Sequence, residues 1–196
     1  MNSFKKIVTL FFLSCFLIFL GCKNSEKTET TLESTSENTQ SSTLNKGQAF
    51  IEDESAEPNA LRLAINSPDH TTLVAAVQAA GVENALVNVG PLTVFAPTNA
   101  AFDKIDKATL DDLLQPENQE KLAYILTNHV APSNYPIETL IKNVEKGRTL
   151  YMASGQYLEV TQEGDAIYVG GTKIIASIKV SNGWVHVIED VILPKN

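Results

Sequence analysis

The side chains of this sequence that could act as nucleophiles, bases or metal ligands are few and widely spaced. There are two cysteines, three histidines and two pairs of neighbouring carboxylates, namely Cys15, Cys22, His70, His129, His186, Asp111–Asp112 and Glu189–Asp190. The histidines show no HExxH or similar ligand spacing, so we expect no metal site and no cofactor. Neither cysteine lies beyond residue 22, which excludes disulfide bonds, thiol catalysis and cysteine-based zinc sites from the rest of the chain.

Hydrolytic chemistry finds little support in the remaining residues. A nucleophilic serine or cysteine needs a neighbouring base that a third group orients. No G-x-S-x-G sequence occurs, and Ala153-Ser154-Gly155 is only a loop-like fragment. Glu189 and Asp190 are adjacent, and neighbouring side chains of an extended segment point to opposite faces, so they are not expected to share an acid–base site. We therefore predict that the domain is not an enzyme, and a hydrolase is the least favoured alternative.

Cys22 has the most clearly defined chemical setting in the chain. Two lysines at positions 5 and 6 lead an apolar run over 7–20, and Gly21 then precedes Cys22. A positively charged segment, a short apolar segment and a small residue before the cleavage site are typical of an export signal. The run is too short to span a bilayer comfortably, because a spanning helix needs about 20 apolar residues.

A cysteine directly after the small residue at such a cleavage site resembles a bacterial lipoprotein signal. Phe19 stands where leucine is usual in these signals. The resemblance implies that the Cys22 thiol carries a diacylglycerol and that the new amino terminus carries a further acyl chain such as palmitate. Two or more acyl chains anchor a protein stably, since each buried CH₂ contributes roughly 0.8 kcal/mol. An ordinary cleaved signal and an uncleaved anchor are the alternatives. Aspartate directly after the lipidated cysteine would indicate retention in the inner membrane, but Lys23 follows Cys22. We therefore expect attachment to the outer membrane, and the leaflet that the protein faces is left open.

The segment 23–48 is rich in Ser, Thr, Glu, Asn and Lys, and Leu32 and Leu44 are its only apolar residues. Such a segment cannot bury enough surface to offset the entropy of ordering it. We therefore predict that 1–21 is a lipoprotein signal peptide, that 22–48 is a lipid-anchored disordered tether, and that 49–196 is one folded domain.

The charge of the chain limits its partners. The formal net charge is −8, and removal of 1–21 would take away Lys5 and Lys6 and make the protein more acidic. Phosphate backbones require clustered lysine and arginine, so we expect no nucleic-acid binding. An acidic protein also gains no affinity for anionic lipid from its charge. We therefore expect membrane attachment through the lipid anchor.

The elements that position the remaining side chains change character along the domain. Helical spacing and capping residues predict helices at 59–65, 69–80, 83–88, 100–105, 109–114, 117–128 and 136–143, with one buried strand at 92–96. Alternation then predicts strands at 157–161, 166–169, 173–176, 177–181, 185–188 and 191–193. Asn182-Gly183 is a strong signal for a hairpin with a type I′ turn. Helices followed by strands predict an α+β fold.

Three segments in order resemble the fasciclin, or FAS1, domain. They are the blocks Thr93–Phe102, Leu126–Val130 and Asn182–Pro194, and the resemblance extends over essentially the whole domain. It implies a β-wedge of short strands packed with several helices. It also implies a function, because family members are mostly secreted or membrane-anchored modules for adhesion and extracellular binding.

The resemblance also brings forward candidate binding residues. Many members place tyrosine directly before the histidine of the central block, and this chain has Asn128 before His129, with Tyr135 a few residues on. A binding contact and a purely structural role are both open for this group. Some animal members contact integrins through an Asp-Ile pair before the last block, and Ser177-Ile178 stands there, so the acidic residue is absent. No Arg-Gly-Asp occurs, and integrin recognition is not expected.

The last block contributes further candidates. Trp184 is the only tryptophan, and it could serve as an interface anchor or pack within the hairpin. The candidate binding residues are therefore Asn128, His129, Tyr135, Ile178 and Trp184. We expect His186 to be a hydrogen-bonded strand residue that faces away from its valine neighbours. We expect His70 to be a solvated residue at a helix start.

Together these observations predict a lipid-anchored protein of the cell envelope whose FAS1 domain acts by contact. The expected partner is a cell-surface or extracellular-matrix protein or polysaccharide, and self-association is also open. A periplasmic scaffold or a protein that binds a small ligand is the main alternative, because adhesion and scaffolding both need only a surface patch.

Overall fold

The computed structural model describes residues 57–87 and 90–194. The expected signal peptide, the lipid attachment at Cys22 and the tether lie outside these residues. Within them, no helix combines the length and apolar character needed to cross a membrane. The described part contains both helices and a mixed sheet, so the predicted α+β class is confirmed.

Helices occupy most of the described chain up to residue 145, and they begin and end where the local sequence favours it. The α-helices are α1 (Ala60–Ile65), α2 (Thr71–Ala80), α3 (Glu83–Val87), α4 (Asn99–Phe102), α5 (Lys107–Leu113), α6 (Gln119–Thr127) and α7 (Ile137–Glu145), and the short 3-10 turns are η2 (Pro68–His70) and η3 (Pro116–Asn118). Asn59 caps α1 by accepting a hydrogen bond from the Arg62 backbone at 2.9 Å. Gly81 ends α2 in the left-handed conformation, with φ at 68°.

The strands form one six-stranded sheet and one separate pair. The strands are β1 (Leu92–Pro97), β2 (Val130–Ala131), β3 (Leu150–Tyr151), β4 (Tyr157–Leu158), β5 (Val160–Glu163), β6 (Ala166–Val169), β7 (Thr172–Val180) and β8 (Gly183–Ile188). The sheet has the order β2-β1-β8-β7-β6-β5, and β3 pairs with β4. β1 and β8 run parallel at its centre, while the other neighbours are antiparallel.

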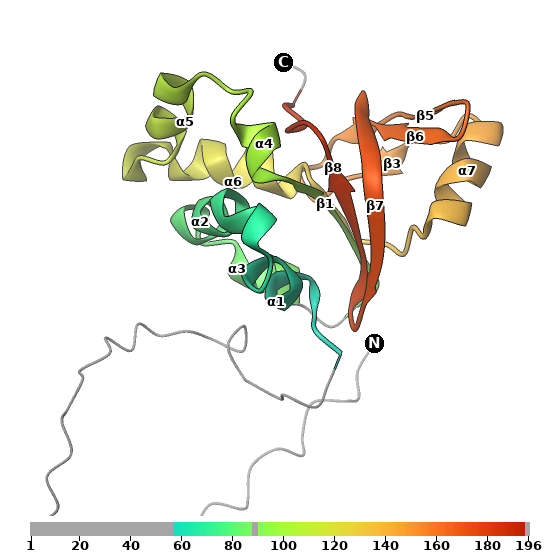
Figure 1. Cartoon of the computed structure of the whole chain (residues 1–196), viewed down its shortest axis with the longest axis horizontal. Coiled ribbons are helices and arrows are strands. Elements are labelled where there is room, and N and C mark those ends of the chain that lie inside the picture. The colour runs from blue at the N-terminus through green and yellow to red at the C-terminus, as the bar shows by residue number, and fades with distance from the viewer. Residues whose placement is uncertain (1–56, 88–89, 195–196) are drawn as a thin grey trace, which may run out of the picture. The chain divides into compact units, whose positions relative to one another are not determined.

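The central strands β1 and β8 separate two hydrophobic clusters. Val94 and Val185 belong to the cluster formed with α1, α2 and α6, whereas Phe95 and Ile188 belong to the cluster formed with α7 and the later strands. Figure 1 shows α1, α2 and α3 on one side of the central strands and α7 with β3, β5 and β6 on the other. Every residue of β1 is buried because both faces are covered, which explains its nearly continuous apolar sequence.

The second half of the domain differs from the prediction in several places. The expected strand at 157–161 is divided into β4, which pairs with β3, and β5, which pairs with β6. A single strand, β7, replaces the two expected strands at 173–176 and 177–181, and its register with β8 shifts between Ile174 and Ala176. The expected strand at 191–193 is wrong, because these residues form no ladder. The two-residue strands β2 and β3 were not predicted, since so short a segment has no detectable alternation.

The β7–β8 hairpin is confirmed, but its turn lies one residue earlier than expected. Val180 pairs with Gly183, so Ser181 and Asn182 form the turn and Gly183 begins β8. The Asn182 side chain accepts a hydrogen bond from the Ala60 backbone at 3.0 Å and donates one to the Leu86 carbonyl at 2.9 Å. The turn therefore fastens the hairpin to α1 and α3, which positions the helices over the sheet.

Candidate functional site

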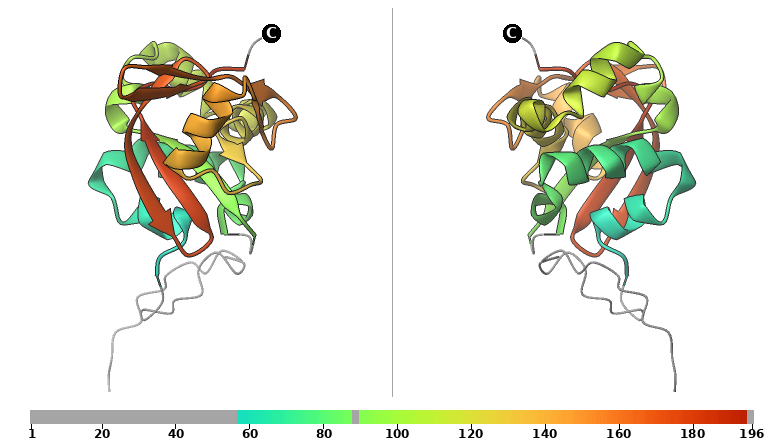
Figure 2. Two further views of the ribbon diagram at one scale, coloured as in Figure 1. Left: turned by 90° about the vertical axis from the view of Figure 1, so that its right-hand side faces the viewer. Right: turned by 90° about the vertical axis from the view of Figure 1, so that its left-hand side faces the viewer.

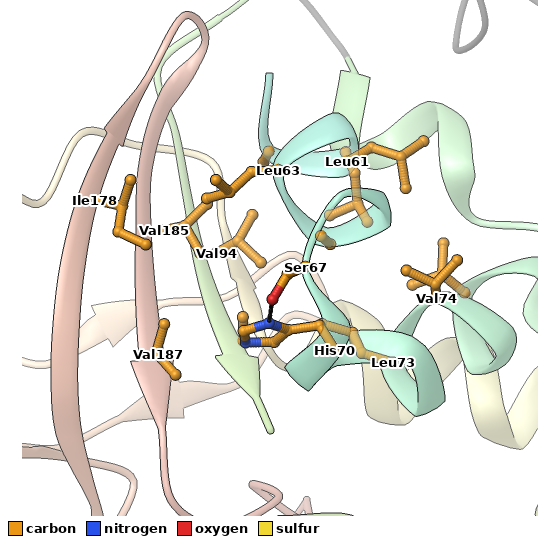
Figure 3. A pocket seen from close by; sticks show the side chains of 15 residues that line it. Leu61, Leu63, Ser67, His70, Leu73, Val74, Val94, Ile178, Val185 and Val187 are labelled. Atoms are coloured by element: carbon orange, nitrogen blue, oxygen red, sulfur yellow. Dashed lines mark hydrogen bonds between the residues drawn. The ribbon is translucent and has the colours of Figure 1, made fainter. Parts of the chain in front are cut away.

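A small apolar pocket lies between the helices α1, η2 and α2 and the strands β1, β8 and β7 (Figure 3). It has a volume of about 60 Å³. Its walls are aliphatic side chains from both layers, including Leu61, Leu63, Leu73, Val94, Val185 and Val187. Two water molecules occupy roughly this volume in the liquid, so the pocket can accept the end of one aliphatic side chain. Sites for drug-sized ligands are several times larger.

His70 contributes the imidazole of this pocket. The ring is only 8% exposed, and its Nδ1 forms a hydrogen bond of 2.7 Å with Ser67 Oγ (Figure 3). Its Nε2 is buried and makes no hydrogen bond within the described residues, although the Ala96 carbonyl lies near it. Burial lowers the pKa of His70, and the Asp69 charge and the Ala96 carbonyl oppose this shift. The expectation of a solvated His70 is wrong, because η2 turns the ring toward the sheet.

Ile178 lies at the border of the pocket, on a strand with an unpaired side. β7 pairs with β8 from Ile174 to Val180 but with β6 only at Thr172 and Lys173. No described strand pairs with the other side of 174–180, which we call the open β7 edge. Ile175 is 52% exposed and Ile178 is 37% exposed, so this edge presents apolar side chains as well as backbone.

Trp184 and Tyr135 both contact His186 on the opposite face of the sheet. The His186 ring stacks between Phe95 and Trp184, with ring centroids 5.5 Å and 6.3 Å away. Its Nε2–H donates to the Tyr135 carbonyl at 2.7 Å, and its Nδ1 accepts from Ser177 Oγ at 2.8 Å. Burial lowers the pKa of His186, and the hydrogen bond to the Tyr135 carbonyl opposes this shift. The predicted role of His186 as a hydrogen-bonded strand residue is confirmed.

Asn128 and His129 follow α6 and are both buried. The His129 Nδ1–H donates to the Ile125 carbonyl at 2.8 Å, and its Nε2 accepts from the Ile192 backbone N–H at 2.9 Å. Burial lowers the pKa of His129 to about 4, although the hydrogen bond to Ile125 acts in the other direction. Both ring nitrogens thus bind the backbone of the same chain, and the neutral imidazole joins α6 to the C-terminal segment.

The five candidate residues do not form one site. Asn128 and His129 lie together beneath the surface, Tyr135 and Trp184 share the face that carries His186, and Ile178 borders the pocket on the other face. The pocket residue His70 and the exposed Ile175 were missed. The apolar sequence Ile174-Ile175 was a signal for the latter, whereas nothing local indicated that His70 is buried. In the described ranges, no three His, Cys, Asp or Glu side chains gather as metal ligands.

Comparison with known proteins places this architecture in a family. The fasciclin domain matches residues 68–194. "Protein sll1483" of Synechocystis sp. is 40% identical over 134 residues, which cover 68% of this chain and 72% of that protein. "Immunogenic protein MPB70" of Mycobacterium bovis is 36% identical over 156 residues, which cover 76% of this chain and 75% of that protein.

Among solved structures, one to which the chain is similar is a FAS1 domain pair from the insect cell adhesion molecule fasciclin I. It aligns with a TM-score of 0.47 and 20% identity, over 68% of this chain and 45% of the other. The match of the fasciclin domain from η2 to the end of the C-terminal segment, together with relatives of 40% and 36% identity, identifies the chain. It belongs to the fasciclin domain family.

Proposed function

We propose that this protein is a lipid-anchored adhesion module of the cell envelope, and that a partner protein binds it by adding an extended segment to the open β7 edge. The observation that carries the proposal is a strand edge that no described strand pairs with, directly beside an apolar pocket. The fasciclin resemblance, which implies extracellular binding, supports the same class of function. The domain would then act by contact, with no catalytic step.

The backbone of β7 offers hydrogen bonds to such a segment. A two-residue turn joins Val180 to Gly183, so this pair exchanges hydrogen bonds within the hairpin. Alternate residues then direct their N–H and C=O groups away from β8, which applies to Lys179 and Ser177. The Ser181 N–H already donates to the Pro58 carbonyl at 3.1 Å on this side. An unpaired edge of this kind is a template for strand addition.

The side chains beside the edge define the chemistry of the partner. Ile178 and Val185 are cross-strand neighbours that border the pocket, so an aliphatic side chain of the added strand could enter it. Lys179 is the only charged residue of 174–180, which favours a carboxylate nearby in the partner. Figure 2 shows the β7–β8 hairpin beside the helices α1 and α2.

Attachment of cells that carry variants of the full-length protein tests the edge. Ile178→Glu places a charge at the pocket border, and Lys179→Pro removes one outward N–H while keeping the bonds to β8. We expect either change to lower cell attachment about tenfold, since an unpaired charge or a lost hydrogen bond costs about 1–3 kcal/mol at an interface. Ile65→Glu is the matched control, because Ile65 is similarly exposed on α1. Attachment that equals the control in both variants would exclude the proposed edge.

The anchor is tested separately. A Cys22→Ser protein cannot form the thioether to diacylglycerol, so we expect it to move from the membrane fraction to the soluble fraction of lysed cells. Retention of this variant in the membrane fraction contradicts lipid anchoring at Cys22. Protease treatment of intact cells then separates surface display, in which the domain is released, from the periplasmic scaffold, in which it is protected.

A further inference from the structure

Three tyrosines are exposed at the surface outside the apolar pocket. Tyr151 on β3 and Tyr157 on β4 form a cross-strand pair, and they are 49% and 66% exposed. Their ring centroids are 5.4 Å apart, with the ring planes tilted by 56°. The hydroxyl of Tyr124, on α6, accepts a hydrogen bond of 2.9 Å from Gln156 Nε2. Exposed tyrosine rings with fixed positions are common at recognition surfaces, because each combines an apolar face with a polar tip.

A cavity of about 510 Å³ adjoins this pair, and we call it the tyrosine groove. Tyr157 and Gln156 border it, and further polar walls come from Thr149, Glu159 and Thr161. Gly170 and Gly171, in the turn between β6 and β7, form another wall, which has no side chains. Both residues have positive φ, at 59° and 86°, a conformation that favours glycine. The volume lies in the range of sites that bind small molecules.

Asn128 lies at the buried side of the tyrosine groove. Its side chain is fully buried, and its Oδ1 accepts a hydrogen bond of 2.9 Å from Ser154 Oγ. Its Nδ2 has no hydrogen-bond partner among the described residues. A buried amide donor without an acceptor is unfavourable, so a group that brings an oxygen to the bottom of the groove would be stabilised there.

We propose that the tyrosine groove binds a neutral saccharide. The face of a hexose ring carries C–H groups that stack on tyrosine, and its hydroxyls both donate and accept hydrogen bonds. Tyr157 supplies the stacking ring, Gln156 and Asn128 supply donors, and Glu159 accepts. Among the described residues that line the groove, Glu159 is the only charged one and none is a lysine or arginine, so an anionic saccharide would be repelled. The site is independent of the open β7 edge, and either proposal can fail alone.

Binding of neutral oligosaccharides to the full-length protein tests this site. The probes are cellohexaose, laminarihexaose and maltohexaose, with tri-galacturonic acid as the charged comparison, and binding is measured by calorimetry and by NMR shifts of the tyrosine rings. We expect millimolar or tighter affinity for at least one neutral probe and none for the charged one. Tyr157→Ala should weaken binding about tenfold, because it removes the stacking ring. Tyr157→Phe retains the ring and should keep most of the affinity.

The same measurements define what would overturn the proposal. No binding of any of the three neutral probes at millimolar concentration excludes the site, as does a Tyr157→Ala protein that binds like the unaltered one. Tighter binding of the charged probe would exclude the assigned ligand class. Ile178→Glu is the control for the other proposal, since it leaves the tyrosine groove intact and should not change saccharide affinity.

Discussion

A Gly183→Ala protein is expected to lose about 3 kcal/mol or more of its free energy of unfolding, because the added methyl group has no space. A Cβ at this position would lie 1.8 Å from the Leu92 carbonyl oxygen, which belongs to the backbone of β1 and cannot move aside alone. Gly183 also has φ at 144°, a conformation that residues with a side chain rarely adopt. The contact lies where β8 begins its parallel pairing with β1, so relief of the clash would disturb the central pair of the sheet.

Chemical denaturation of the full-length protein measures this effect, and Gly164→Ala is the matched control. Gly164 also has positive φ, at 57°, but nothing lies within 4 Å of a Cβ built there. Its substitution should therefore cost only the conformational strain, about 1 kcal/mol. The difference between the two variants isolates the steric clash with β1. Equal denaturation midpoints for both variants would show that β1 and β8 move apart at little cost in free energy, contrary to this expectation.

The second large effect is a loss of stability in mild acid that depends on His129. Its pKa is about 4 in the folded protein, against 6.5 for an exposed histidine. Above pH 6.5 the imidazole is neutral in both the folded and the unfolded state. Its full contribution to the free energy of unfolding is therefore present. As the pH falls from 6.5 toward 4, the unfolded chain binds a proton that the folded chain does not, so the folded state loses about 3 kcal/mol in relative free energy.

The geometry of His129 explains why protonation is so unfavourable. The ring is completely enclosed, and its Nε2 accepts the hydrogen bond from the Ile192 N–H. A proton on Nε2 would therefore face another donor and would place a charge in a site where no described carboxylate pairs with it. His70 and His186 also have pKa values lowered by burial, and they add to the acid sensitivity in the same direction.

Two measurements test the role of His129. His129→Gln keeps an acceptor and a donor without a titrating group, and we expect its unfolding free energy to vary less between pH 6.5 and 4 than that of the unaltered protein. NMR titration of the unaltered protein should show no protonation of the His129 ring above about pH 5. A ring that titrates near 6.5 in the folded protein would contradict the assignment, even if the glutamine variant did not fold.

Much of the helical half was predictable because its signals are local. Gly81 as a stop signal and the spacing of apolar residues act within one or two turns, and the helices lie close to the expected ranges. The fasciclin resemblance was also carried by contiguous segments, and it is confirmed. The alternating strands were predicted less well, because a strand is defined by its partner. The residues 191–193 alternate in sequence yet pair with nothing in the described chain.

What the sequence determined by itself was the class of each segment, the family, and an acidic composition unsuited to nucleic acid, since these follow from residue type and short-range spacing. Only the tertiary structure decided that His70 enters an apolar pocket, that no described strand pairs with one side of β7, and that Tyr151 meets Tyr157. Each of these depends on which distant segment packs against a residue. Burial and pairing arise from contacts between segments far apart in the chain, and no local pattern specifies such contacts.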